Sequence, residues 1–121
     1  NELILLIDDE PYLIDLGREV LESLGYRVIV ASNGLEGVDI FNANKEEVAL
    51  VITDIMMPKL GGEETIKRIK KVRPEIKVIF TTGYNKEAEA ISNLSSGNNE
   101  IIYKPYDIET LSCLIKKLLS S

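Results

Sequence analysis

The chain has 121 residues with 45% hydrophobic and 28% charged content, which is typical of one soluble globular domain and argues against a disordered or membrane-spanning chain. Its 20 acidic and 14 basic residues give a formal net charge of −6, which disfavours a nucleic-acid surface because such a surface needs a basic stripe. Because the chain has no histidine and one cysteine, a histidine-based triad, a histidine zinc site, a phosphohistidine relay and an internal disulfide are excluded within it.

Apolar runs of strand length alternate with amphipathic stretches of helix length along the chain. Most runs are continuous rather than alternating, which indicates strands buried on both faces. The predicted strands cover residues 3–7, 28–31, 49–53, 78–81 and 101–103. The predicted helices cover residues 10–24, 34–44, 62–72, 86–95 and 107–119.

Capping and turn residues agree with these boundaries. Pro11 suits the first turn of the first helix, and Gly25 suits the position just after its end. Asn33 with Glu36 three residues later resembles a capping box, and Pro74 ends the third helix. We also expect Phe41 and Phe80 in the core and Gly17 at a close packing contact. The last helix has an apolar face made of Ile108, Leu111, Ile115, Leu118 and Leu119. Cys113 lies opposite this face, so we expect it to be exposed.

Five strand–helix pairs predict an α/β fold, with a parallel sheet and helices on both of its faces. No internal repeat or linker divides the chain, so we expect a single domain over residues 1–121. Chain order alone leaves two strand orders open, 2-1-3-4-5 and 3-2-1-4-5. Ligands bind at the carboxyl ends of the strands in either arrangement.

Candidate site residues follow four of the five predicted strands, whereas the polar residues after the second strand, Ser32 and Asn33, suit a helix cap. Asp8 and Asp9 come after the first strand, Asp54 after the third, Thr82 after the fourth and Lys104 after the fifth. Three carboxylates in one cleft repel one another, and a hard cation bound by oxygen ligands would relieve the repulsion. The pattern therefore predicts a Mg²⁺ site beside a lysine, with a threonine hydroxyl available for hydrogen bonding.

Mg²⁺ together with lysine suits a phosphoryl group, and an aspartate can itself be the nucleophile that forms an aspartyl-phosphate. Each feature has a plainer interpretation when taken alone. An Asp-Asp pair opening a helix is most often a cap, Lys104 can be a solvated loop residue, and Thr82-Gly83 can be a turn. Their joint placement at four strand ends favours the site.

The chain resembles the receiver domain of two-component response regulators over essentially its whole length. The residues that carry the resemblance are Asp8-Asp9-Glu10-Pro11, Asp54-Ile55-Met56-Met57-Pro58, Gly62, Thr82-Gly83 and Lys104-Pro105. The resemblance implies the flavodoxin-like, doubly wound fold with strand order 2-1-3-4-5.

The resemblance also implies a role for each site residue. Asp54 would accept the phosphoryl group. Asp9 would ligate Mg²⁺ directly, Asp8 would act largely through a water, and the backbone carbonyl of Met56 would complete the protein's share of the metal shell.

Two further residues would contact the phosphoryl group. Lys104 would pair with one of its oxygens, and Thr82 would move to hydrogen-bond it. The domain would catalyse its own phosphorylation and a slow dephosphorylation without being a conventional enzyme. Dephosphorylation should be slow because neither Met56 nor Tyr84, which flank the site in this family, would orient a water well.

The implied partners lie on other domains or proteins. The donor would be a phosphohistidine-bearing kinase or phosphotransfer domain, and the output partner would bind the face made by the fourth helix, fifth strand and fifth helix. A dimer that forms on phosphorylation is compatible with the family. We expect no nucleic-acid or membrane contact by this domain and, without a recognisable leader, a cytoplasmic location. A hybrid sensor kinase, a transcription factor and a stand-alone regulator remain open as the parent protein.

One position departs from the family. An aromatic residue usually lies three residues before the lysine of the last strand, and here that residue is Ile101. Tyr103 lies two residues later, on the same side of the strand. We expect the aromatic relay to be absent or weakened.

Three other functions remain as alternatives. A Mg²⁺-dependent phosphohydrolase would need an acid two residues after Asp54, where Met56 stands. A nucleotide or flavin binder would need a glycine-rich loop after the first strand, which is acidic here. A degenerate receiver would act only as a docking module.

Overall fold

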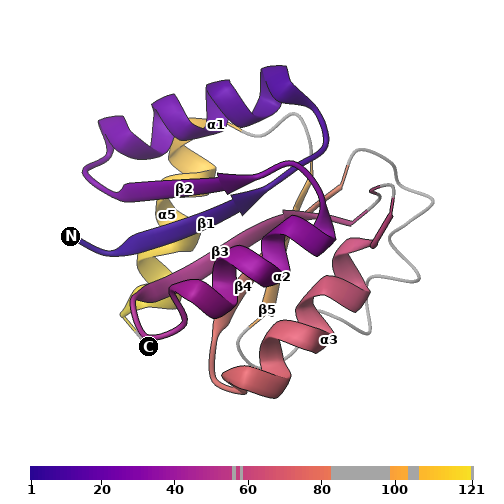
Figure 1. Cartoon of the computed structure of the whole chain (residues 1–121). Helices are drawn as coiled ribbons and strands as arrows, with labels where there is room; N and C mark the ends of the chain where they lie inside the picture. The colour runs from indigo at the N-terminus through magenta and orange to yellow at the C-terminus, as the bar shows by residue number, and fades with distance from the viewer. Residues whose placement is uncertain (56, 58, 83–98, 104–106, 121) are drawn as a thin grey trace.

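Figure 1 shows a computed structural model of the chain, which describes residues 1–55, 57, 59–82, 99–103 and 107–120. The described strands are β1 (Leu3–Ile7), β2 (Arg27–Ala31), β3 (Val48–Asp54), β4 (Lys77–Thr82) and β5 (Asn99–Tyr103). The described helices are α1 (Pro11–Ser23), α2 (Gly34–Ala43), α3 (Gly62–Val72) and α5 (Ile108–Leu119). The predicted helix over residues 86–95 lies outside the described residues. Within the described ranges, no helix has the length and hydrophobicity needed to cross a membrane.

The five strands form one parallel sheet in the order β2-β1-β3-β4-β5. This confirms the predicted fold class and decides between the two strand orders that chain order had left open. β1 lies between β2 and β3, with Ile7 paired to Ala31 on one side and to Thr53 on the other. The carboxyl ends of β1 and β3 are therefore neighbours.

Helices cover both faces of the sheet, and each face has its own hydrophobic cluster (Figure 1). Alternation along β1 sends Leu3, Leu5 and Ile7 toward α2 and α3, and Ile4 and Leu6 toward α1 and α5. Phe41 and Phe80 lie in the first cluster with at most 1% exposure, as predicted. The continuous apolar runs in the sequence thus reflect burial on both sides.

The helix ends match the capping residues in the sequence. Gly25 follows α1 with φ +97°, and the N–H groups of Gly25 and Tyr26 donate to carbonyls of the last turn at 3.0 and 3.2 Å. Asn33 caps α2 by accepting a hydrogen bond from Glu36 N at 2.9 Å. The Glu36 carboxylate reaches back to the N–H of Ser32 at 3.0 Å rather than to the cap residue itself.

Arg73 joins two loops at the amino-terminal edge of the sheet. Its Nη1 donates to the carbonyls of Lys45 and Val48, and its Nε donates to the Glu75 carboxylate at 3.2 Å. A hydrogen bond from its own backbone N–H, followed by that from Arg73, lowers the pKa of Glu75. This arrangement holds the start of β3 against the end of α3, on the opposite edge of the sheet from the acidic residues.

The last strand and the last helix carry polar and exposed residues beside their buried ones. β5 begins at Asn99, two residues before the predicted start of this strand, and Glu100 forms an ion pair with Lys117 of α5 at 2.9 Å. An edge strand tolerates such polar residues because one side is open to solvent. Ile108 is 52% exposed although it lies on the apolar face of α5, because it occupies the first helical position. Cys113 is exposed, as predicted.

Candidate functional site

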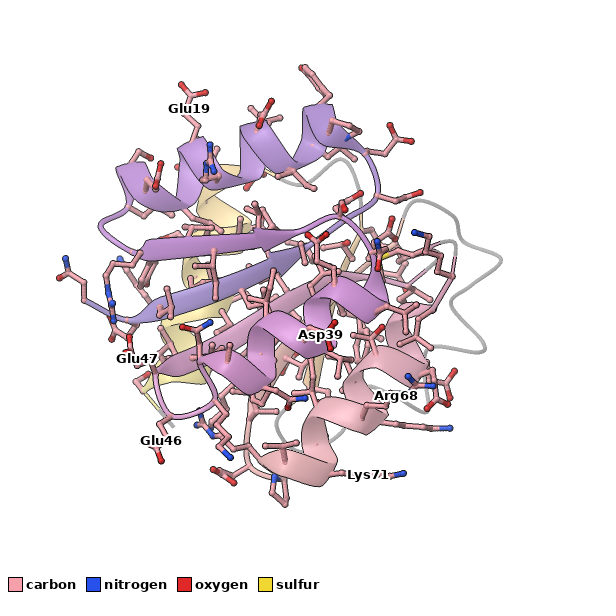
Figure 2. All side chains as sticks on the ribbon, in the orientation of Figure 1. Glu19, Asp39, Glu46, Glu47, Arg68 and Lys71 are labelled. Atoms are coloured by element: carbon pink, nitrogen blue, oxygen red, sulfur yellow. The ribbon has the colours of Figure 1, made fainter. Side chains whose placement is uncertain are left out.

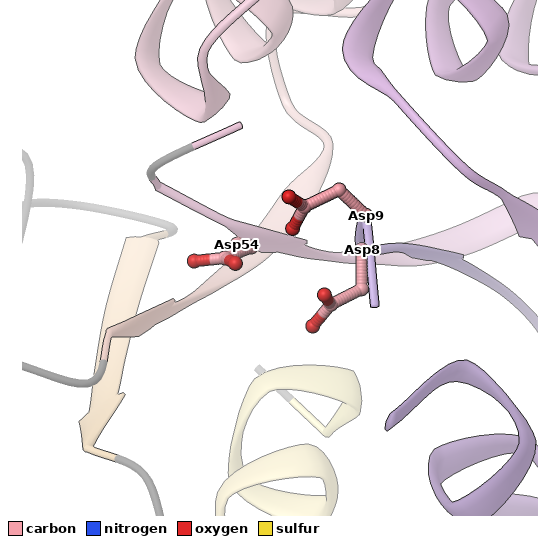
Figure 3. Close-up of side chains that lie close together, drawn as sticks. All are labelled: Asp8, Asp9 and Asp54. Carbon is pink, nitrogen blue, oxygen red and sulfur yellow. The ribbon is translucent and has the colours of Figure 1, made fainter. Parts of the chain in front are cut away.

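Three aspartates meet at the carboxyl-terminal edge of the sheet (Figure 3). Asp8 and Asp9 follow β1, and Asp54 is the last residue of the neighbouring strand β3. Each offers a carboxylate oxygen that lies within 4.8 Å of those of the other two. The sequence prediction that these side chains share one site is consistent with this geometry.

The cluster is acidic and largely removed from solvent. Asp8 is 5% exposed and Asp54 is 8% exposed, whereas Asp9 is half-buried. Two like charges about 5 Å apart repel by about 3 kcal/mol at an effective dielectric constant of about 20. Three oxygen-donor carboxylates that repel one another fit a hard divalent cation, because Mg²⁺ binds one or two carboxylates and keeps several waters.

The connection from β1 to α1 fixes the first two carboxylates. Asp8 N donates to Ala31 O at 3.2 Å, so the residue continues the β1–β2 pairing beyond the strand. Asp8 Oδ1 accepts a hydrogen bond from Glu10 N at 3.0 Å, which turns the chain into α1 at Pro11. The loop contains no glycine and cannot cradle a phosphate with its backbone, which agrees with the sequence argument against a nucleotide site.

The backbone around Asp54 is held from two sides. Asp54 pairs with Thr81 of β4, and Ile55 N donates to Thr81 O at 3.1 Å. On the other side, Gly62 N donates to Ile55 O at 2.9 Å. A Cβ on Gly62 would lie 2.2 Å from Asp54 O and 2.9 Å from Ile55 Cα, so only glycine fits here without a shift.

Gly62 is thus a positioning residue of the site. The family resemblance included Gly62 among its matching residues, but the sequence offered no structural reason for a glycine there. The signal that marks it is a Gly-Gly pair at the start of a predicted helix, eight residues after Asp54. The close approach itself depends on how α3 meets the end of β3, which a single sequence does not reveal.

Of the other predicted site residues, Thr82 lies within the described part of the chain. Thr82 is the last residue of β4 and is fully buried, at the same edge of the sheet as Asp54. Lys104 and Met56 lie outside the described residues, so their roles stay predictions. Tyr84, named for its effect on phosphate lifetime, also lies outside them.

Comparisons with known proteins identify the family to which the chain is similar. A model of the response regulator receiver domain matches residues 4–116. The transcriptional regulatory protein CpxR homolog of Haemophilus influenzae is 36% identical over 116 residues, which cover 96% of this chain and 49% of that protein. The chain spans about half the length, or less, of the curated relatives that it matches.

Two solved structures have the same fold. A response regulator receiver domain protein from Clostridium thermocellum has a TM-score of 0.92 and 36% identity, with 99% of this chain and 95% of that chain covered. The response regulator protein TrrA from Thermotoga maritima, solved in complex with Mg²⁺-BeF, has a TM-score of 0.87 and 33% identity. That comparison covers 98% of this chain and 100% of the other.

Proposed function

Because the chain belongs to the response regulator receiver domain family, we propose that it accepts a phosphoryl group from a phosphohistidine onto Asp54 and then changes conformation. The observation that supports this most directly is the meeting of Asp8, Asp9 and Asp54 within 4.8 Å. The chain has no histidine, so the donor belongs to another domain or protein. We take residues 1–121 as one receiver domain.

Asp8, Asp9 and Asp54 would hold Mg²⁺, with the backbone carbonyl of Met56 as a further ligand. The bound ion would neutralise charge on the phosphoryl oxygens during transfer. Two features support this assignment. The donor set consists of oxygen atoms alone, and the related TrrA binds Mg²⁺-BeF.

The protein's own side chains would position the reacting groups. Asp54 presents its carboxylate at the end of a rigid strand, so attack on the phosphorus needs little reorganisation. The product gains about 1.5 to 2 negative charges and three acceptor oxygens. Lys104 would pair with one of these oxygens and Thr82 would donate a hydrogen bond to another. Contacts made only in the phosphorylated state favour a second conformation.

Loss of the phosphoryl group would be slow. Hydrolysis needs a water that is aligned on the phosphorus, and a side-chain acid or amide beside the site provides such alignment. The two flanking residues are Met56 and Tyr84, which offer neither group. We therefore expect a persistent aspartyl-phosphate, with a longer lifetime than in a Met56→Asn variant.

The partners follow from the chemistry. A phosphohistidine-bearing kinase or phosphotransfer domain would deliver the phosphoryl group in the cytoplasm. An output domain or partner protein would recognise the altered surface near β5 and α5. The chain covers 12% of the sensor kinase CckA of Brucella abortus and 49% of the CpxR homolog, which both carry further sequence beside the part that it matches.

Acetyl phosphate labelling tests the proposal. The chain is incubated with Mg²⁺ and acetyl phosphate, and its intact mass is measured. We expect one phosphoryl adduct in the wild type and none in Asp54→Asn or in the presence of EDTA. Asp39→Asn is the matched control, because Asp39 is an exposed acid on α2, away from the cluster (Figure 2).

Three other outcomes would each contradict the proposal. A wild-type chain without an adduct and without a response to beryllofluoride would point to a docking module. Repeated turnover of small phosphate esters would point to a phosphohydrolase. An adduct that persists in Asp54→Asn would show that the assigned acceptor is wrong.

A further inference from the structure

The start of α2 touches the loop that leads from Asp54 to α3. The helices α2 and α3 lie side by side on one face of the sheet (Figure 1). A Cβ on Gly34, the first residue of α2, would lie 2.5 Å from Leu60 O and 2.9 Å from Leu60 Cβ. The φ angle of Gly34 lies outside the left-handed region, so its backbone conformation is open to other residues. Lack of space alone therefore requires a glycine here.

Gly34 also lies against a buried hydroxyl group of α3. The same Cβ would lie 2.2 Å from Thr65 Oγ1, and Thr65 is fully buried. Thr65 Oγ1 donates to Gly61 O at 2.8 Å, and Thr65 N donates to the same carbonyl at 2.9 Å. The hydroxyl thus contacts the start of α2 and the end of the loop together.

The contacts continue from Gly61 to the proposed phosphoacceptor. Gly61 is followed by Gly62, whose backbone leaves no room for a Cβ beside Asp54 O. Gly62 N also donates to Ile55 O at 2.9 Å, which ties the two ends of the loop together. Because these atoms are closely packed, a displacement of the Gly61 carbonyl must reach the backbone of Asp54.

Thr65 is a costly choice for a buried position of α3. Its neighbours on the buried face include Ile66 and Ile69, and threonine has a lower helix propensity than leucine or alanine. A buried hydroxyl needs a hydrogen-bond partner, which here is Gly61 O. The hydroxyl also sets a distance, because its oxygen approaches Gly61 O to 2.8 Å, whereas a carbon and an oxygen in contact lie about 3.3–3.6 Å apart.

We propose that Gly34 and Thr65 are positioning residues, which hold Gly61 and, through Gly62, the Asp54 carboxylate in the geometry that binds Mg²⁺ and accepts the phosphoryl group. The inference rests on the proposed function, which assigns Mg²⁺ to the three aspartates. The aspartates come from the ends of β1 and β3, so α2 serves the site without offering a ligand.

Thr65→Val removes the hydroxyl and keeps the branched shape of the side chain. A valine has one strongly preferred rotamer in a helix, so its methyl group takes the place of the hydroxyl and moves Gly61 O by about 0.5 Å. We expect the Mg²⁺ affinity of the unphosphorylated chain, measured by isothermal titration calorimetry, to fall by about 10-fold. The maximal rate of acetyl phosphate labelling at saturating Mg²⁺ should fall as well. Thr65→Ser, which keeps the hydroxyl, should retain the wild-type affinity and rate.

Two glycines of α2 provide a matched pair of variants. Gly34→Ala places a methyl group against the loop backbone, whereas Gly37→Ala places one 2.5 Å from Ile7 Cδ1, the end of a side chain that can turn aside. Urea unfolding measures the effect of each change on stability. Only Gly34→Ala should weaken Mg²⁺ binding and slow labelling of the folded chain, which a purely structural role of the two glycines would not predict.

Three results would overturn the inference and leave the proposed function intact. They are wild-type Mg²⁺ affinity and labelling in Thr65→Val, equal losses in Thr65→Ser and Thr65→Val, or equal losses in Gly37→Ala and Gly34→Ala. If Gly34→Ala does not fold, the two threonine variants decide the question. A wild-type chain that neither binds Mg²⁺ nor takes up a phosphoryl group would instead overturn the proposed function, and this inference with it.

Discussion

Gly62 offers a direct test of how the fold positions Asp54. In Gly62→Ala the added methyl carbon would lie 2.2 Å from Asp54 O, whereas a carbon and an oxygen in contact lie about 3.3–3.6 Å apart. The start of α3 or the backbone of Asp54 must therefore move by about 1 Å. Backbone atoms supply both close contacts, so no flexible side chain can absorb the shift.

The cost follows from three contributions. Overpacking costs about 1–3 kcal/mol, and loss of the hydrogen bond from Gly62 N to Ile55 O adds about 0.5–1.5 kcal/mol. Reduced freedom of the unfolded chain returns about 0.4–1 kcal/mol. We expect a net loss of about 2 kcal/mol in the free energy of unfolding, which lowers the urea midpoint by about 1 M at a slope of about 2 kcal/mol/M.

Gly61→Ala is the matched control. A Cβ on Gly61 would lie 3.4 Å from Ile55 O, an ordinary contact, and its φ of −68° suits alanine. A weaker helix cap and a stiffer unfolded chain offset each other, so its stability should stay within about 0.5 kcal/mol of the wild type.

Urea unfolding followed by circular dichroism measures both variants, and acetyl phosphate labelling of the folded protein measures the site. Since a misplacement of about 1 Å can lower a rate by about 100-fold, labelling of Gly62→Ala should slow far more than that of Gly61→Ala. If both variants unfolded at the same urea concentration and labelled at the same rate, the close approach of α3 to Asp54 would not hold the site.

Three further predictions concern stability. Arg73→Ala should lower the free energy of unfolding by about 1–3 kcal/mol, because two backbone carbonyls lose their hydrogen-bond donor. The control is Arg68→Ala, which removes an exposed ion pair on α3 and should lower the free energy of unfolding by about 0.5 kcal/mol or less in the same urea assay. Lys59→Gly should raise the stability by up to about 1 kcal/mol, since Lys59 has φ 69°, and a lower urea midpoint would contradict the strain. Backbone and side-chain hydrogen bonds from Thr110 lower the pKa of Asp107 below its ordinary value of 3.8. The ionised carboxylate therefore stabilises the fold above pH 3.8, and this stabilisation is lost as the pH falls through the pKa that Asp107 has in the folded protein. In Asp107→Asn the cap no longer titrates, so urea midpoints measured from neutral to acidic pH should fall less steeply below pH 3.8; an unchanged slope would show that the cap is not responsible.

The sequence was sufficient to predict the fold class and the elements that lie within the described residues. Continuous apolar runs mark strands buried on both faces, and all five described strands lie where such runs occur. Strand order could not come from the chain alone, because it depends on which strands pair and not on their succession. Asn99 and Glu100 extend β5 although both are polar, because an edge strand makes ladder hydrogen bonds without full burial.

The sequence indicates which residues form the candidate site more readily than it indicates how they are arranged. Residue type and position at a strand end identified Asp8, Asp9 and Asp54, since parallel strands end at a common edge. Their meeting also requires β1 and β3 to be adjacent, which the family resemblance supplied and the structure confirms. The contact of Gly62 with the Asp54 backbone, and the pairing of Thr82 with Tyr103, depend on register and on helix placement.

The uniform burial of β1 has a consequence for folding. All five residues of the strand are apolar and at most 5% exposed, so a slip by one residue would still leave hydrophobic side chains on both faces. The usual inward–outward alternation therefore cannot fix the alignment of this central strand. The charged neighbours can. A slip in one direction would carry the Asp8 carboxylate from the acidic edge of the sheet into the apolar cluster around Ile7, and a slip in the other would carry the exposed Glu2 into the place of Leu3. Either would set a charge among apolar side chains at high cost. Asp8 thus opposes one direction of misaligned pairing as well as being a proposed metal ligand. Replacing it by an apolar residue would remove that opposition and the proposed ligand together, and would leave Glu2 to oppose the other direction.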